Sequence, residues 1–265
     1  MLSVQAAIEV KTCCAALYES DWARLLLGES FHPGGLELTE RLGNLLDLRP
    51  GSRVLDVASG TGASAVLLAG KFGCEVVGLD YSAELVGQAR LRARDAGLEH
   101  LVRFEVGDSE SLPFVDGFFD ALICECSFCT FPDKSSAARE FARVLRAGGR
   151  VGLSDIALNG SLPPELNGLL AQIVCIADAL PWDRYEALLR EAGFGIDRVE
   201  PHPEALGSTV AAIQKRLFGA EFFLKVKKIE IPGVDIRQAQ NVAKIAAKTI
   251  EDGTLGYGLL LGTLL

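Results

Sequence analysis

A glycine-rich loop followed by an acidic residue is the first feature of this sequence that suits a particular chemistry. Gly60-Thr61-Gly62 stands between an apolar run and a helical stretch. Glycines there let the backbone approach a ligand, and the start of the next helix offers unpaired N–H groups. With Ala65 the loop satisfies G-x-G-x-x-A, and Asp80 lies about twenty residues on, where a ribose-binding acid belongs. The pattern predicts a ligand that contains adenosine, and it does not separate a dinucleotide from other such ligands.

Two further acids accompany this loop. Asp56 lies four residues before Gly60, inside the apolar run that precedes the loop. Gly107-Asp108-Ser109 ends the third expected strand, 102–106. Ligands of open α/β sheets bind beyond the carboxyl ends of the strands, so we expect these acids to lie beside the same adenosine site.

Cysteines form the second group with chemical potential. Because their number is odd and the chain is not a short secreted one, we expect thiols, ligands or redox groups in a reducing compartment rather than a disulfide framework. Cys124, Cys126 and Cys129 are close in sequence. A structural zinc site of this kind uses two C-x-x-C pairs, and these three cysteines do not provide two. The seven cysteines are at positions 13, 14, 74, 124, 126, 129 and 175.

Alternating strands and helices must position these residues. The expected strands are 53–58, 75–80, 102–106, 121–126, 151–156, 196–199 and 255–263. The expected helices are 14–27, 36–46, 63–71, 83–96, 135–145, 162–180, 181–192, 204–223 and 235–251. This alternation indicates parallel βαβ units in a doubly wound α/β sheet.

Composition limits the class of protein. A chain of 265 residues with 49% hydrophobic and 23% charged residues fits one large α/β domain with appendages. The net charge of −9 argues against nucleic acid or an anionic membrane as a partner. No run of eighteen apolar residues and no signal-peptide pattern is seen, so a cytoplasmic location is expected.

The ordered motifs resemble the class I S-adenosylmethionine-dependent methyltransferases. The residues that carry this resemblance are Val54-Leu55-Asp56-Val57-Ala58-Ser59-Gly60-Thr61-Gly62, Leu79-Asp80, Gly107-Asp108, Leu112-Pro113-Phe114 and Phe119-Asp120. The resemblance implies a Rossmann-like seven-stranded sheet in the order 3-2-1-4-5-7-6 with the last strand antiparallel. It also implies a domain over 49–265, a helical lid at 1–48, and helical acceptor-side and tail elements at 159–195 and 204–251.

The same resemblance implies roles for individual residues. Asp80 would hold the ribose hydroxyls, Asp108 and Ser109 would reach the adenine, and Tyr81 would pack on it. Gly60 and Gly62 would face the methionine part of S-adenosylmethionine. The implied cofactor site comprises Asp56, Ser59, Gly60, Thr61, Gly62, Asp80, Tyr81, Asp108, Ser109 and Glu125.

A narrower resemblance concerns the methyl acceptor. The segments 123–156 and 175–194, with Phe131-Pro132-Asp133-Lys134 and Cys175-Ile176-Ala177-Asp178, resemble the arsenite methyltransferases. In that family two cysteines bind trivalent arsenic, and Cys126 and Cys175 occupy their positions. Arsenic prefers thiolates and keeps a lone pair that attacks the methyl carbon, so this acceptor needs no general base. A thiol reductant such as glutathione or thioredoxin is the implied partner.

One departure from that family leaves alternatives open. Many members have a third cysteine after the glycine loop, where this chain has Ala63-Ser64-Ala65. Cys129, Cys13 and Cys14 are the candidate substitutes. The alternative functions are methylation of another small molecule with incidental cysteines, a non-catalytic S-adenosylmethionine-binding or arsenical-binding module, and a nucleotide-dependent oxidoreductase. The last lacks a catalytic Tyr-Lys or His-Asp arrangement after the loop.

Overall fold

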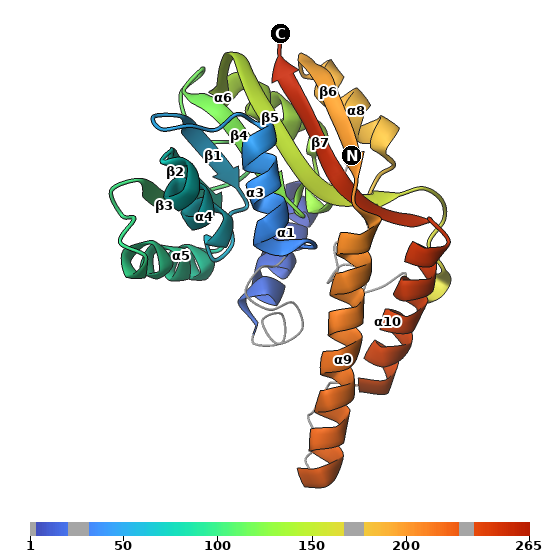
Figure 1. Ribbon diagram of the computed structural model, residues 1–265. Helices are drawn as coiled ribbons and strands as arrows, with labels where there is room; N and C mark the ends of the chain where they lie inside the picture. The colour runs from blue at the N-terminus through green and yellow to red at the C-terminus, as the bar shows by residue number, and fades with distance from the viewer. Residues whose placement is uncertain (1–3, 21–31, 167–177, 228–235) are drawn as a thin grey trace.

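A seven-stranded sheet forms the centre of the molecule (Figure 1). The computed structural model describes residues 4–20, 32–166, 178–227 and 236–265. The strand order is β3-β2-β1-β4-β5-β7-β6, and β7 runs antiparallel to both β5 and β6, which confirms the expected fold. The strands are β1 (Arg53–Val57), β2 (Glu75–Asp80), β3 (Val102–Val106), β4 (Phe119–Glu125), β5 (Leu145–Leu158), β6 (Phe194–Pro201) and β7 (Leu255–Leu264).

Helices cover both faces of this sheet (Figure 1). On one face α3 (Gly35–Leu45) packs on α4 (Ala63–Phe72), which also contacts α5 (Ala83–Asp95). On the other face α6 (Lys134–Val144) packs on α8 (Trp182–Glu191). Strands covered on both sides become continuous apolar runs, and Leu55, Leu122 and Leu259 are each 0% exposed.

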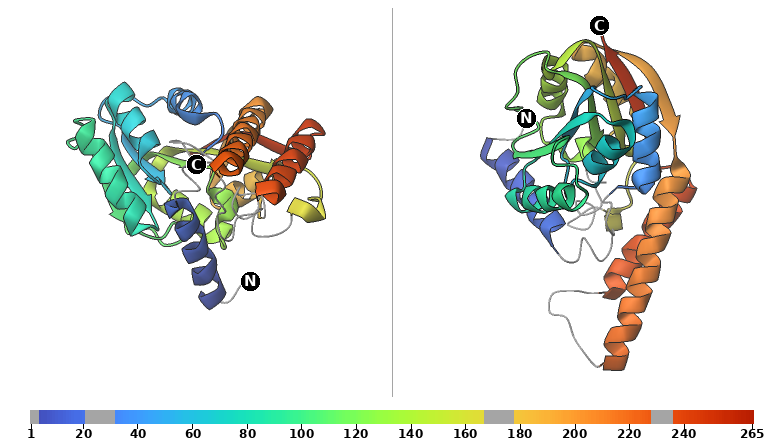
Figure 2. Two further views of the ribbon diagram at one scale, coloured as in Figure 1. Left: turned by 90° about the horizontal axis from the view of Figure 1, so that it is seen from below. Right: turned by 60° about the vertical axis from the view of Figure 1, so that its left-hand side comes forward.

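Further helices lie outside the two layers. Helix α1 (Val4–Glu19) lies at the carboxyl end of the parallel strands, while α9 (Pro203–Lys227) and α10 (Ile236–Glu251) pack together and project from the body (Figures 1 and 2). Two short 3-10 helices, η1 (Phe128–Thr130) and η2 (Pro164–Leu166), occur in connections. Within the described residues, no helix combines the length and apolar character needed to cross a bilayer.

The observed elements differ from the expected ones at several boundaries. Strand β5 begins at Leu145, before the expected start at 151, and residues 150–158 pair with β7 throughout. Strand β4 ends at Glu125, one residue before the end of the expected strand 121–126, so Cys126 lies beyond the strand. Most of the helix expected at 162–180 lies outside the described residues.

Candidate active site

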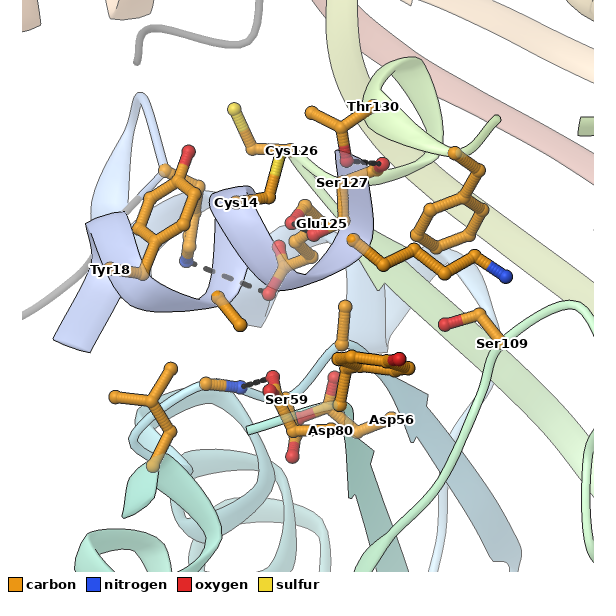
Figure 3. Close-up of a pocket in the computed structure, with 18 of the residues that line it drawn as sticks. Cys14, Tyr18, Asp56, Ser59, Asp80, Ser109, Glu125, Cys126, Ser127 and Thr130 are labelled. Atoms are coloured by element: carbon orange, nitrogen blue, oxygen red, sulfur yellow. Dashed lines mark hydrogen bonds and ion pairs between the residues drawn. The ribbon is translucent and has the colours of Figure 1, made fainter. Parts of the chain in front are cut away.

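A cavity opens at the carboxyl ends of β1, β2 and β4, beneath α1 (Figure 3). It is lined by residues that are distant in sequence: α1, the glycine loop, the ends of β2, β3 and β4, and the β4–α6 connection. Every cofactor residue expected from the sequence lines it except Gly62, which caps α4 beside it. The members of the expected set in the lining are Asp56, Ser59, Gly60, Thr61, Asp80, Tyr81, Asp108, Ser109 and Glu125.

The glycine loop has a shape that other residues would not adopt. Gly60 and Gly62 have φ angles of 53° and 76°, in the left-handed region. A Cβ on Gly62 would lie 2.5 Å from Cζ of Phe104. Asp80 fixes the loop from the neighbouring strand, because its carboxylate accepts hydrogen bonds from the Gly60 amide at 2.7 Å and the Ser82 amide at 2.8 Å. The first turn of α4 has no side-chain cap, so its N–H groups suit a ligand.

Two buried polar atoms beside the loop lack a partner among the described residues. Oδ2 of Asp56 and Oγ of Ser59 are buried and accept or donate no hydrogen bond there. Burial, together with the charges of Glu125 and Asp80, raises the pKa of Asp56 well above its usual range. A cationic ligand group that donates hydrogen bonds to Asp56 would give its oxygen a partner and would stabilise its buried negative charge. The site therefore fits a ligand with a positively charged amino group near this strand end.

Helix α1 closes the cavity above the end of β3. Its residues Lys11, Cys14 and Tyr18 line the cavity. The ammonium of Lys11 forms ion pairs with Asp108, at 2.8 Å, and with Glu110. Burial opposes the charge on Lys11, but its hydrogen bonds and the charges of both acids outweigh burial and raise its pKa.

The structure separates the candidate cysteines. Cys126, with an unusual φ of 52°, lines the cavity together with Cys14 of α1, and Figure 3 shows both side chains at the same end of it. Cys13 is exposed, and the buried Cys129 is outside the lining, with its amide donating to Asp155 at 2.9 Å. Cys175 lies outside the described residues.

The two remaining cysteines are in the core. Cys74 and Cys124 are each 0% exposed. Burial raises the pKa of Cys74 to about 11 and raises that of Cys124 as well. A high pKa disfavours the reactive thiolate, so these two residues fill space.

The cavity wall contains a histidine, His32, that no sequence motif indicated. His32 lines the cavity, and its Nε2 lies 3.3 Å from Oγ1 of Thr39 and 3.6 Å from Oε2 of Glu125. Thr39 and Ser64 donate to the Glu125 carboxylate at 3.0 Å and 2.6 Å. No sequence motif connects His32 with the glycine loop, although loops at the edge of a sheet often carry functional residues.

Comparison with known proteins agrees with this geometry. Residues 55–153 match the family model described as a methyltransferase domain. The chain contains a methyltransferase domain. The matched residues include the glycine loop, Asp80, Asp108 and Cys126, so they cover most of the cavity. The match supports the S-adenosylmethionine-dependent methyltransferases, which is the class that the sequence motifs indicated.

Individual relatives of this methyltransferase domain differ in what their names describe. The chain is 36% identical over 165 residues to methyltransferase GfsG of Streptomyces halstedii and 35% identical over 170 residues to 27-O-demethylrifamycin SV methyltransferase of Amycolatopsis mediterranei. These matches cover 61% and 62% of this chain, and 59% and 61% of the relatives' length. The chain therefore spans about three fifths of these two proteins.

An arsenite methyltransferase is also among the relatives. The protein from Aquipseudomonas alcaligenes is 31% identical over 235 residues, which cover 82% of this chain and 65% of the relative. Among solved structures, a putative sarcosine dimethylglycine methyltransferase from Galdieria sulphuraria superimposes with a TM-score of 0.75 at 20% identity, over 86% of this chain and 85% of the other. The structural likeness supports the fold, and the varied relatives support the coarser class rather than one acceptor.

Proposed function

We propose that this protein transfers a methyl group from S-adenosylmethionine to a small molecule bound between the glycine loop and Cys126. The observation that carries this proposal is the pair of buried, unpartnered polar atoms of Asp56 and Ser59 beside the glycine loop. The amino group of the cofactor's methionine part would donate to Asp56. The remaining lone pairs of Asp80 would accept from the ribose hydroxyls, and Asp108 and Ser109 would meet the adenine beside Tyr81.

When bound, the cofactor supplies an activated methyl group, so the protein has to align a nucleophile with that carbon. Thr130, Phe131 and Pro132 of the β4–α6 connection line the cavity next to Cys126, and Tyr18 covers it from α1. These residues would hold the acceptor and exclude water. Small molecules rather than polymers fit a cavity that a helix covers.

Thiol-bound trivalent arsenic is the first acceptor that we propose. Cys126 and Cys14 provide two thiols in the cavity lining, and Cys175 is the further ligand that the sequence indicates. Because Cys13 is exposed, Cys14 is the member of the N-terminal pair suited to complete the arsenic site. A thiol reductant such as glutathione or thioredoxin would regenerate the thiols. The relative named as an arsenite methyltransferase supports this chemistry.

A hydroxyl or amino group is the second candidate acceptor, and His32 is the observation that favours it. Nδ1 of His32 lies 3.4 Å from the Pro33 carbonyl and Nε2 lies 3.6 Å from Oε2 of Glu125, so acceptor atoms lie beside both ring nitrogens. The nitrogen that carries no proton in the neutral ring would take the proton that a protic acceptor loses, with Glu125 beside the resulting cation. The name of the rifamycin relative describes an acceptor oxygen.

Formation of S-adenosylhomocysteine separates these candidates. The purified protein is assayed with arsenite plus glutathione, with 27-O-demethylrifamycin SV and with sarcosine. Turnover of arsenite that is lost in both Cys126→Ser and Cys175→Ser supports the first candidate. Turnover of an organic probe that is lost in His32→Gln but kept in the control His100→Gln supports the second. If the cofactor binds but both cysteine variants keep wild-type arsenite turnover, the role of these thiols is wrong.

A further inference from the structure

Helix α1 covers the cavity through a single face. Lys11, Cys14, Ala15 and Tyr18 all line the cavity, and their spacing of three, one and three residues places them on one side of a helix. Cys13 and Ala16, which lie outside the lining, are exposed. In Figure 3 this helix passes directly over the labelled cofactor residues. A ligand that fills the cavity would therefore lie against this face of α1.

Polar contacts at two points hold α1 in place. Lys11 pairs with Asp108 and Glu110 after the end of β3. About two turns further along the helix, Glu19 accepts a hydrogen bond at 2.6 Å from the hydroxyl of Ser82, the N-cap residue of α5. Helix α1 packs extensively against none of the other described helices and strands. Tyr18 also packs against the core, and among the described polar contacts Lys11 and Glu19 attach α1 to the body of the domain.

Lys11 is the stronger of the two attachments. Its ammonium lies 2.9 Å and 2.8 Å from the two carboxylate oxygens of Asp108 and also bonds to Glu110, and its side chain is only 14% exposed. Charged hydrogen bonds are stronger than neutral ones. Asp108 is also the residue proposed to meet the adenine, so one lysine touches both the covering helix and the cofactor site.

Glu110 extends this contact to the acceptor side. Its second carboxylate oxygen accepts a hydrogen bond at 2.7 Å from the amide of Asp133, the N-cap residue of α6. Phe131 and Pro132, directly before Asp133, line the cavity. Lys11, Glu110 and Asp133 therefore connect α1 to the loop that faces the acceptor.

We propose that Lys11 is a positioning residue that fixes Asp108 for the adenine and gates cofactor exchange by holding α1 closed. Opening requires the ammonium to leave both carboxylates. The product S-adenosylhomocysteine fills the same site and must leave by the same route. This inference rests on the proposed function, since it takes the adenosine cofactor as the ligand of the cavity.

Binding kinetics of S-adenosylhomocysteine test the gate without any acceptor. Surface plasmon resonance gives association and dissociation rates for wild type, Lys11→Met, Lys11→Arg and Glu110→Gln. The control is Lys71→Met, because Lys71 pairs with Glu40 at 2.6 Å and both residues are outside the cavity lining. Circular dichroism checks that each variant is folded.

In Lys11→Met we expect dissociation about tenfold faster, a change that loss of a charged hydrogen bond supplies, and faster association as well. Glu110→Gln changes both rates in the same direction, while Lys11→Arg and Lys71→Met stay close to wild type. Raising NaCl from about 50 to about 500 mM should speed dissociation from wild type but not from Lys11→Met. A helix that merely lost stability would not lose its salt response in this way.

Two results overturn the inference. If Lys11→Met exchanges the ligand within about twofold of wild type, or if only its association rate falls, Lys11 does not gate the cavity. If wild type binds no S-adenosylhomocysteine, the proposed function fails first and the gate with it. A response in Lys11→Met that Lys71→Met reproduces would also contradict a specific role for Lys11.

Discussion

The backbone amide of Gly60 donates a hydrogen bond to Oδ2 of Asp80 at 2.7 Å. An acid at the end of β2 thus holds the loop that follows β1, while its other oxygen accepts from the Ser82 amide at the start of α5. The residue proposed to bind the ribose therefore also fixes the loop proposed to face the methionine part. Cofactor affinity and loop order are coupled through one carboxylate.

Gly62→Ala should disturb this loop. The residue has a φ of 76°, and an added Cβ would lie 2.5 Å from Cζ of Phe104 and 2.9 Å from Cβ of Ala89. We expect the free energy of unfolding to fall by about 2 kcal/mol and S-adenosylmethionine binding to weaken. Urea denaturation measures the first effect and calorimetry the second.

Gly87→Ala is the matched control for that change. Gly87 lies within α5, and nothing stands within 4 Å of the Cβ that alanine would add. Alanine there should stabilise the protein by about 0.5 to 1 kcal/mol through helix propensity. Equal effects of the two substitutions would show that the space around Gly62 is not limiting.

Asp56→Asn should have opposite effects on stability and affinity. The buried Asp56 has an unpartnered oxygen and a raised pKa, caused by burial and by the charges of Glu125 and Asp80. Removing its charge should raise the free energy of unfolding of the ligand-free protein at pH 8 by about 1 to 2 kcal/mol. The same change removes the charge and one of the two acceptor oxygens proposed to meet the cofactor's amino group, and it should weaken cofactor binding.

The pH dependence of stability has a definite sign at Asp56. A carboxyl whose folded pKa exceeds its unfolded value binds more protons in the folded state, so its contribution makes stability fall as pH rises above about 4. The advantage of Asp56→Asn over wild type should therefore grow with pH. Thermal unfolding of both proteins between about pH 4 and pH 8 measures it. A constant difference would mean that Asp56 does not titrate as the surroundings indicate.

Cys14→Ser and Cys13→Ser should differ, although the residues are adjacent. Neighbouring residues on a helix point about 100° apart, and here Cys14 lines the cavity while Cys13 is exposed. If arsenic is the acceptor, we expect Cys14→Ser to lose about tenfold or more in arsenite turnover under limited reductant, with Cys13→Ser unchanged. Identical behaviour of the two variants would remove Cys14 from the acceptor site.

Local patterns in the sequence predicted most of the fold. The limits of β2 agree with expectation because it is a short, mostly apolar run between two helix signals, and those of β3 agree because its apolar and charged residues alternate. The extension of β5 to Ala157 and Leu158 was not predictable locally, because β7 supplies their partners from about a hundred residues away. Antiparallel pairing of that kind depends on topology rather than on composition.

The residues of the site also fall into those that local patterns predicted and those that only the structure identified. Gly60, Asp80 and Asp108 were found because a strand–loop–helix unit fixes their spacing from one another. Lys11 and His32 reach the cavity from segments whose distance from the loop no motif fixes, and nothing in the sequence pairs Lys11 with Asp108 or His32 with Glu125. Three-dimensional contact alone identified these residues.

Calorimetric titration of S-adenosylmethionine into wild type and Asp80→Ala tests the central claim most directly. The substitution removes two backbone hydrogen bonds of the glycine loop and the acceptor proposed for the ribose. Wild type should bind one equivalent of S-adenosylmethionine and no NAD, and Asp80→Ala should bind it at least about thirtyfold more weakly, on the scale of about 2 kcal/mol. Equal affinity in the two proteins, or binding of NAD in place of S-adenosylmethionine, would contradict the account.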